Sequence, residues 1–185
     1  MQKVIYPLDF LAFAVLNRSL RLTSGFLTLV REKNLIAAAP LVRLQLDNCL
    51  RFFASTLVDQ PHDFAIQVLG GTRIDQMKDR SGKRLTDSYL KQLLSAHEPW
   101  IDPVYKETSG FIHLSEKHIF NSLTLTNVET REILMKISDT DEFVPEEAYL
   151  EAVDVFTRTT KLALTFALAW AAQRNRPQLE NPSQK

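Results

Sequence analysis

Apolar residues recur at intervals of three and four along most of the chain, which is the spacing that places them on one face of a helix. Pro7 suits the first turn of a helix over residues 7–32, where the apolar positions are 8, 11, 15, 16, 20, 26, 27 and 30. A second helix is predicted over 35–57. Because Pro40 lies inside it, lacks an N–H and crowds the preceding turn, it should kink this helix or start a new one.

The next segment predicts a short helix followed by a polar loop. The stretch QPHD at 60–63 opens the helix, and the two glycines at 70–71 close it. Residues 72–84 are polar and contain DRSGKR, which is typical of a turn. We expect a mobile loop here, and its composition leaves open whether it closes over a site like a lid.

Two further short helices are predicted after this loop. Thr86 or Asp87 caps the first of them. This helix ends before Pro99, because the residue that precedes a proline is biased away from the helical conformation. The second is predicted over 102–113. These helices would pack beside the two long ones.

The period changes beyond the fifth helix. NSLTLT at 121–126 and REILMKIS at 131–138 alternate between apolar and polar residues, which is typical of a β-hairpin at about 119–138. A last long helix is predicted over 145–173, with Pro145 near its first position. The predicted fold class is therefore mainly α, a helical bundle of five to six helices with a small β-hairpin inserted before the last long helix.

Composition fits a single domain, predicted over 1–176, with a flexible tail at 177–185. Lys and Arg total 22 and Asp and Glu total 22, so the zero net charge gives no general attraction to nucleic acid or to an anionic membrane. Cys49 is the single cysteine, which excludes an intramolecular disulfide. The most apolar run, at 162–172, is too short to span a membrane, and the first residues do not resemble a signal peptide. We therefore expect a cytoplasmic protein that does not contact a membrane.

Arg43, Asp47 and Arg51 interrupt an otherwise apolar stretch of the second predicted helix at steps of four residues. Such steps place the three side chains in one polar stripe. In a structural interpretation, Asp47 bridges the two arginines and fixes this helix against the first, where Asn17 and Arg18 could join the network. In a functional interpretation, Asp47 orients an arginine that grips a phosphate or a carboxylate. The spacing does not distinguish the two.

A second candidate cluster lies in YKETSGFIHLSEKH at 105–118. If the fifth helix continues to residue 113, Tyr105, Ser109 and His113 lie on one face, and His118 follows at the helix exit. A histidine can move protons near neutral pH, and the adjacent hydroxyls could orient it. In the alternative interpretation, His113 is a core or capping histidine and His118 begins a strand.

The sequence predicts neither a metal site nor a bound cofactor. His113 and His118 are five residues apart, which is not the spacing that places two metal ligands on one helical face. The chain also contains no glycine-rich phosphate loop, no nucleophile elbow and no dinucleotide fingerprint.

The stretches AAAPLVRLQLDNCLRF and YKETSGFIHLS together resemble a group of bacterial helical proteins that pair an Arg-x-x-x-acid helix with a later Ser-x-x-x-His segment. This group is similar to the HEPN-like domains, which are helical modules common in toxin–antitoxin and phage-defence systems. The resemblance covers roughly residues 10–120 together with the last helix.

The resemblance implies a dimeric helical bundle that cleaves RNA without a metal. Arg43 would hold the scissile phosphate beside Asp47, while His113 would move protons for attack by the 2′-hydroxyl, with Ser109 as its supporting partner. The HEPN ribonuclease signature places an arginine a few residues before the histidine on the same helix. Here the nearest basic residue upstream of His113 is Lys106.

Two functional hypotheses follow from the resemblance and the two clusters. The first is a metal-independent endoribonuclease built on Arg43, Asp47 and His113. The second is a non-catalytic module, such as a regulatory or immunity protein, that binds a ligand or a partner protein encoded nearby. The binding site would then also include Arg51, Ser109, Tyr105 and His118. A homodimer is expected in both cases, and RNA is a possible partner.

Overall fold

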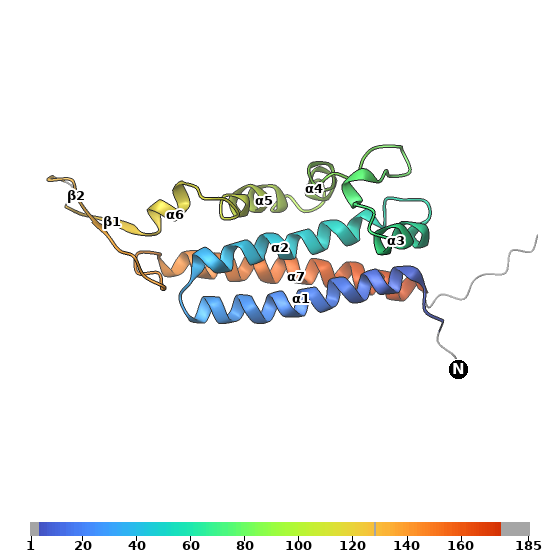
Figure 1. Ribbon diagram of the computed structural model, residues 1–185, viewed down its shortest axis with the longest axis horizontal. Coiled ribbons are helices and arrows are strands. Elements are labelled where there is room, and N and C mark those ends of the chain that lie inside the picture. Colours follow the sequence, from blue (N-terminus) through green and yellow to red (C-terminus); the bar gives the residue numbers. More distant parts are fainter. Residues whose placement is uncertain (1–3, 128, 175–185) are drawn as a thin grey trace, which may run out of the picture.

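Three long helices run side by side and form the body of the protein (Figure 1). The computed structural model describes residues 4–127 and 129–174, and the tail predicted at 177–185 lies outside this part. The three helices are α1 (Pro7–Arg31), α2 (Leu35–Ala54) and α7 (Glu146–Arg174). The described chain is mainly helical and carries a two-stranded antiparallel hairpin before α7, which confirms the predicted fold class.

α2 is a single continuous helix from Leu35 to Ala54, although Pro40 lies inside it. The side chain of Asn34 caps it by accepting a hydrogen bond from the N–H of Ala37 at 3.0 Å. α2 continues through Pro40, so the alternative that a new helix starts there is wrong. The neighbouring side chains of Ala39 and Val42 are buried. Burial of this face stabilises the helix and offsets the backbone hydrogen bond that the proline cannot donate.

Four shorter α-helices and one turn of 3-10 helix, η1 (Ile74–Gln76), lie between α2 and the hairpin in the part of the chain that the structure describes. The α-helices are α3 (Pro61–Leu69), α4 (Asp87–Ser95), α5 (Ile101–Ser109) and α6 (Glu116–Phe120). The sequence predicted that α5 continues to residue 113, but the helix ends at Ser109. α6 was not predicted, because five residues are too few to show a helical period. His118 lies in α6, so the alternative that it begins a strand is wrong.

The polar segment 72–84 is anchored to the bundle, where the composition predicts a mobile loop. The guanidinium of Arg80 donates to the backbone carbonyl of Thr56 at 2.7 Å, just beyond the end of α2. The carboxylate of Asp79 accepts a hydrogen bond from the hydroxyl of Tyr89 on α4 at 2.7 Å. These contacts hold the segment against two helices, and a lid movement would have to break them.

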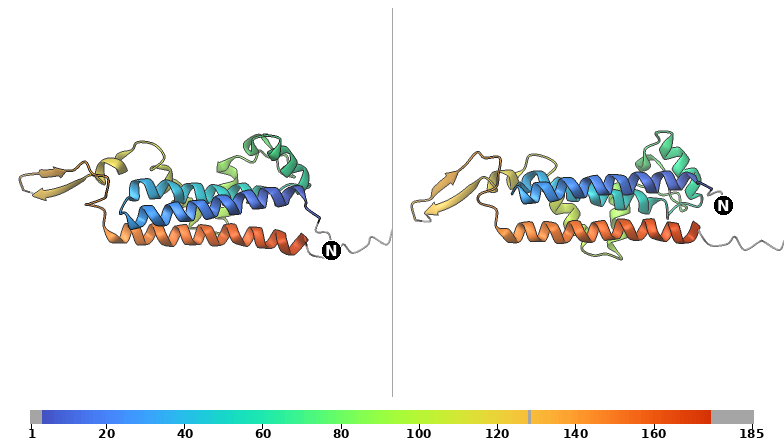
Figure 2. Two further views of the ribbon diagram at one scale, coloured as in Figure 1. Left: turned by 60° about the horizontal axis from the view of Figure 1, so that its bottom comes forward. Right: turned by 90° about the horizontal axis from the view of Figure 1, so that it is seen from below.

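The hairpin consists of β1 (Leu123–Asn127) and β2 (Glu132–Met135) and projects beyond the end of the bundle (Figures 1 and 2). The strands are antiparallel, and the register shifts between Leu125 and Asn127, where β1 bulges. At the root, the carboxylate of Asp141 accepts hydrogen bonds from the N–H of Leu35 and from the hydroxyl of Tyr149, both at 2.5 Å. The root is therefore fixed to the starts of α2 and α7.

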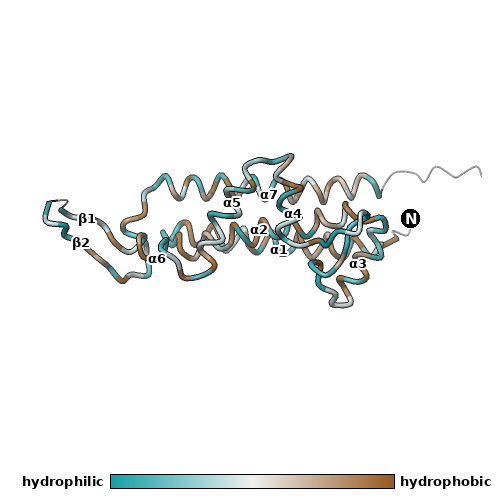
Figure 3. The backbone as a smooth tube through the Cα atoms, turned by 90° about the horizontal axis from the view of Figure 1, so that it is seen from above, coloured by the Kyte–Doolittle hydropathy of each residue, from teal (hydrophilic) through white to brown (hydrophobic). Residues whose placement is uncertain are grey.

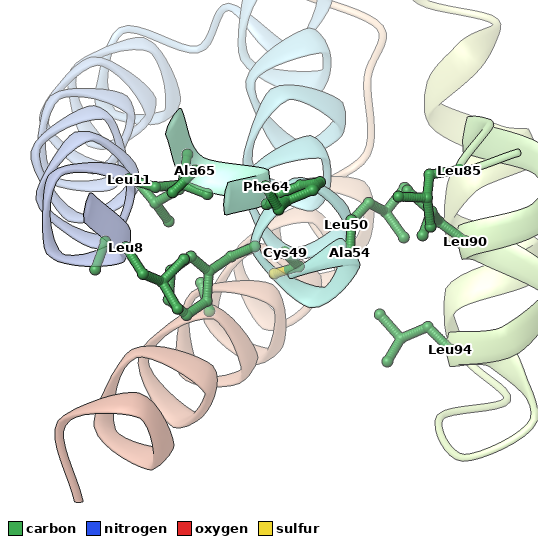
Figure 4. Packing of buried hydrophobic residues seen from close by; sticks show 14 of the residues in the cluster. Leu8, Leu11, Cys49, Leu50, Ala54, Phe64, Ala65, Leu85, Leu90 and Leu94 are labelled. Carbon is green, nitrogen blue, oxygen red and sulfur yellow. The ribbon is translucent and has the colours of Figure 1, made fainter. Parts of the chain in front are cut away.

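The main core lies where α3, α4 and the start of α5 meet the long helices. Figure 4 shows Leu8 of α1, Phe64 of α3, Leu50 of α2 and Leu90 of α4 among the buried side chains that converge there. A second, smaller core contains the stacked rings of Phe26 and Phe156, with ring centroids 4.2 Å apart. The cores fasten α3, α4 and α5 to the long helices.

Hydropathy alternates along the long helices, as expected for helices that bury one face (Figure 3). Within the described ranges, none of the helices is long and apolar enough to cross a membrane.

Candidate functional site

A chain of ion pairs crosses from α1 over α2 to α4. Its first link is Asp47, whose carboxylate accepts hydrogen bonds from Arg18 at 2.8 Å and from Arg51 at 3.0 Å. Arg18 lies on α1, whereas Asp47 and Arg51 are one turn apart on α2. The carboxylate therefore ties two neighbouring helices together while it holds the Arg51 guanidinium in place.

The second link is Asp87, the first residue of α4. Its carboxylate pairs with Arg51 and accepts a hydrogen bond from Arg43 at 3.3 Å. A carboxylate in the first turn of a helix is also stabilised by the positive end of the helix dipole. Asp87 therefore joins the start of α4 to two arginines of α2.

The network ends on α5, at the ring of Tyr105. The Arg43 guanidinium carbon lies 4.0 Å from the centroid of this ring, and the Lys91 ammonium lies 5.3 Å from it. Cations at these distances are attracted to the electron-rich face of an aromatic ring. Lys91 also pairs with Asp102 in the first turn of α5. Ion pairs and cation–π contacts therefore connect α2, α4 and α5.

A buried polar chain leads inward from the same network. Arg18 also donates to the side-chain oxygen of Asn48 at 2.8 Å, and Asn48 donates to Gln45 at 3.0 Å. Gln45 is fully buried and donates to Thr160 on α7 at 3.0 Å and to Ser19 on α1. Buried amides are tolerated because their donors and acceptors have partners. This chain fixes the register of α1, α2 and α7.

The sequence predicted part of this network. Asp47 does pair with Arg51, and Arg18 joins from α1 as expected. The prediction that Asp47 also bridges Arg43 is wrong, because Arg43 turns toward Asp87 on a helix more than forty positions away in the chain. Sequence reasoning treated Asp87 only as a helix cap.

Gln45 and Asn48 were also missed. Both lie among apolar residues of α2, Gln45 two residues from Arg43 and from Asp47, and Asn48 directly after Asp47. The available signal was that two amides interrupt a helix otherwise suited to burial. A polar side chain in such a position must have a partner.

All three arginines of the network are already paired with carboxylates, and they differ in exposure. The Arg43 side chain is 13% exposed and the Arg18 side chain 41% exposed. A phosphate could bind only by displacing a carboxylate or by using the outward side of Arg18. The arrangement is therefore typical of a structural ion network, because an anion-binding site would need an arginine that is free to bind the anion.

The second predicted cluster does not assemble. The hydroxyl of Ser109 donates to the backbone carbonyl of Tyr105 at 2.6 Å, within the last turn of α5. His113 follows the end of this helix and is exposed, so Tyr105, Ser109 and His113 do not share a helical face. No hydrogen bond or ion pair between described residues connects His113 to the arginines. The ring nitrogen Nδ1 of His118 accepts from the N–H of Ser115 at 3.2 Å and caps α6.

An apolar groove lies on the other side of α5 from the network. Its floor comes from α2, one wall from α5 and the other wall from α7, and its volume is about 520 Å³. Val104 and Val42 line it directly beside Tyr105 and Arg43, which belong to the network. The remaining lining residues are Leu35, Ala39, Trp100, Pro103, Glu107, Thr108, Phe111, Ala148, Glu151, Ala152, Asp154, Val155 and Arg158.

Within residues 4–127 and 129–174, no group of three or more His, Cys, Asp or Glu side chains could hold a metal ion. Comparison of the chain with protein-family models, with curated proteins and with solved structures gives no match.

Proposed function

We propose that this protein is a non-catalytic binding module that takes an amphipathic helix of a partner protein into the groove between α5 and α7. The single observation that carries this proposal is the groove itself, with its apolar floor and its volume of about 520 Å³. Ligand sites in proteins are typically apolar clefts of this size with a few polar groups at the edge. Amphipathic helices bind in grooves of this kind through their apolar face.

The α7 wall of the groove fits a helix. Ala148, Ala152 and Val155 line it on successive turns. Between residues 148 and 158 the wall is about 15 Å long, since a helix rises about 1.5 Å per residue. The small side chains would allow a second helix to approach α7 closely, and Trp100 and Phe111 could contact its apolar residues from the other wall.

The rim of the groove favours a basic partner. Glu107, Glu151 and Asp154 line the groove; Asp154 pairs with Arg158 and Glu107 pairs with Lys117, so Glu151 is the carboxylate of this lining without an ion pair among the described residues. Opposite charges at the edge of an interface favour the correct partner and speed its association. We therefore expect a partner helix with apolar residues on one face and lysine or arginine at the borders of that face.

The ion network would serve this function by holding the groove open in one shape. Arg43 and Tyr105 fasten α5 to α2 on the side away from the groove. A wall that is already in place reduces the ordering cost of binding. The polar stripe would therefore act on binding through α5, without itself touching the partner.

The resemblance to HEPN-like modules supports a partner protein encoded nearby, as in a toxin–antitoxin or defence system. The homodimer implied by that resemblance and the cytoplasmic location predicted from composition are parts of the same proposal.

A helical peptide built from leucine and lysine, with apolar residues on one face, tests the proposal. We expect it to bind the protein in a fluorescence anisotropy titration, and we expect an analogue with glutamate in place of lysine to bind at least tenfold more weakly. Ala152→Trp fills the groove and should abolish binding. Thr157→Trp places the same ring on an exposed position of α7 that does not line the groove, and should bind normally. Equal binding by both variants would contradict the proposal.

The metal-independent ribonuclease is the second candidate. The observation that favours it is the exposure of His113, which leaves its imidazole accessible to a substrate. Since no contact joins His113 to Arg43 or Asp47 within the described chain, such a site would need a second copy to complete it. Its test is a cleavage assay with a His113 variant.

A further inference from the structure

The hairpin exposes an apolar face to water. Leu123 pairs with Met135, and Leu125 pairs with Ile133, so these four side chains share one face of the two-stranded sheet. Ile133 and Met135 are 55% and 66% exposed. A two-stranded hairpin is at best marginally stable in water, and a cluster of exposed apolar residues commonly marks a contact surface. This hairpin therefore has the properties of an element that another chain completes.

The position of the hairpin leaves it accessible. It extends past the end of the long helices in both views of Figure 2. Asp141 holds its root through Leu35 and Tyr149, so the strands project from a fixed base. Two copies could join through their hairpins without a collision of their helical bodies.

The outer edge of β2 is ready for pairing. The N–H of Lys136 donates to the carbonyl of Ser122 at 3.0 Å, so this residue bonds inward, toward the other strand. Because successive residues of a strand direct their backbone groups to opposite edges, Leu134 also bonds inward. Ile133 and Met135 therefore present their N–H and C=O groups to the outer edge, where the described chain supplies no third strand.

The outer edge of β1 is less suited to pairing. The register shift between Leu125 and Asn127 places an extra residue in β1 opposite one residue of β2. A bulge of this kind bends the strand and interrupts its row of backbone groups, a device that protects strand edges from pairing. β2 has no such interruption between Glu132 and Met135. The regular edge is therefore that of β2.

We propose that two copies of this chain join by antiparallel pairing of their β2 edges, with the twofold axis at Leu134. This register places Ile133 opposite Met135 of the second copy, so the outward-facing backbone groups of both strands meet each other. The proposal rests on the homodimer of the proposed function and names its interface. The product is a four-stranded sheet shared by the two copies.

The charges of β2 fit this register. Glu132 comes to lie directly opposite Lys136 of the second copy, whose ammonium also pairs with Glu142 of its own chain, and the symmetry repeats this arrangement on the other side of the axis. Opposite charges across neighbouring strands stabilise a sheet, whereas like charges destabilise it. Leu134, an apolar residue on the otherwise polar face with Glu132 and Lys136, meets its own copy at the axis. In this register, the apolar residues of one face and the charged residues of the other face both meet suitable partners on the second copy.

The same register supplies apolar contacts for the exposed face. Because the strands run antiparallel, the tip of each hairpin comes beside the root of the other. At that root, α6 exposes Ile119 and Phe120, which are 53% and 64% exposed. These side chains would contact the apolar face of the incoming hairpin and remove both from water.

Sedimentation equilibrium of the full chain and of charge-swapped variants tests the interface. We expect a dimer for the wild type and a roughly tenfold higher dissociation constant for Glu132→Lys. In this variant the lysine at position 132 of each copy lies opposite Lys136 of the other copy, and the like charges repel. The double variant Glu132→Lys with Lys136→Glu restores opposite charges only in the proposed register, and should recover the dimer. Leu20→Lys, on the exposed face of α1, is the control and should leave the dimer intact. Circular dichroism verifies the fold of each variant.

The outcomes separate the interface from the homodimer itself. If Glu132→Lys leaves the dimer unchanged, the β2 interface is wrong although the protein is a homodimer. The same holds if the double variant does not restore the dimer. Loss of the dimer in Leu20→Lys alone would place the interface on α1. A monomeric wild type would overturn both the interface and the homodimer, and would leave the binding groove to its own test.

Discussion

The guanidinium of Arg43 reaches the carboxylate of Asp87 at 3.3 Å, although the two residues are 44 positions apart in the chain. Asp47, one turn from Arg43 on the same helix, pairs instead with Arg18 and Arg51. Long-range pairs of this kind join helices, whereas pairs within one helix only support that helix. The polar stripe of α2 therefore connects α1 on one side with α4 on the other.

Two features of the network favour a structural role over an anion site. Each arginine already has a carboxylate partner, and Arg43 is also covered by the Tyr105 ring. The inward branch runs through Asn48 and Gln45 to Thr160 of α7, and both amide side chains are buried out of reach of a ligand in solution. The network and its inward branch join α1, α2, α4, α5 and α7, and three of these helices, α2, α5 and α7, line the groove.

Replacement of Asp87 by alanine should lower the free energy of unfolding by about 1–2 kcal/mol, since Arg43 and Arg51 would lose a shared partner. The measurement is urea unfolding followed by circular dichroism. Asp102→Ala is the matched control, because Asp102 also lies in the first turn of a helix but pairs with a single lysine and is 59% exposed. Its expected cost is below about 1 kcal/mol. Equal losses for the two variants would show that only the helix dipole matters at these positions.

The elements of the fold follow from the period of the apolar residues, and this part of the structure could be predicted. The long helices and the hairpin fall within a few residues of the predicted ranges because each contains several repeats of its period. α5 was predicted too long because the apolar residues Phe111 and Ile112 continue its pattern past Ser109. The structure ends the helix there, and Ser115 then caps α6.

The candidate site was less predictable, because its contacts join residues far apart in the chain. The step of four residues on α2 correctly indicated the pair of Asp47 and Arg51. No local pattern could show that Asp87 would take Arg43, or that the loop after α5 would carry His113 away from its helical face. Which side chains form ion pairs between two helices depends on how the helices pack, and the packing cannot be read from the local sequence pattern.

Acid should weaken the contact that anchors segment 72–84. Hydrogen bonds from Tyr89 and Ser81 lower the pKa of Asp79 from 3.8 to about 2. A carboxylate with a lowered pKa in the folded state contributes stability above pH 3.8, and this stability is lost as the pH falls toward 2. We expect Asp79→Asn to flatten the decline of stability over that interval, as measured by urea midpoints at several pH values. An unchanged slope in the variant would contradict the assignment.

Cys49 should resist thiol reagents while the protein is folded. Burial raises the pKa of its thiol from 9.0 to about 12, so the reactive thiolate fraction is roughly a thousandfold lower than for an ordinary cysteine. The Sγ atom also lies 3.1 Å from the carbonyl oxygen of Thr159, between α2 and α7. We expect labelling by a disulfide reagent at mildly alkaline pH to follow global unfolding in urea. Rapid labelling without denaturant would mean that α7 separates from α2 in the native state.

Replacement of His113 by alanine separates the two candidate functions. If the protein is a binding module, neither the wild type nor the variant should cleave total RNA or transfer RNA in the presence of a chelator, and both should bind the basic amphipathic peptide equally. This outcome is expected because His113 has no hydrogen bond or ion pair with Arg43 or Asp47 among the described residues, although its imidazole is exposed. Circular dichroism at matched concentration excludes a folding defect, and His97→Ala, which changes a histidine beyond the end of α4, controls for the loss of an imidazole. Cleavage by the wild type and by His97→Ala, but not by His113→Ala, would establish the ribonuclease and refute the non-catalytic module.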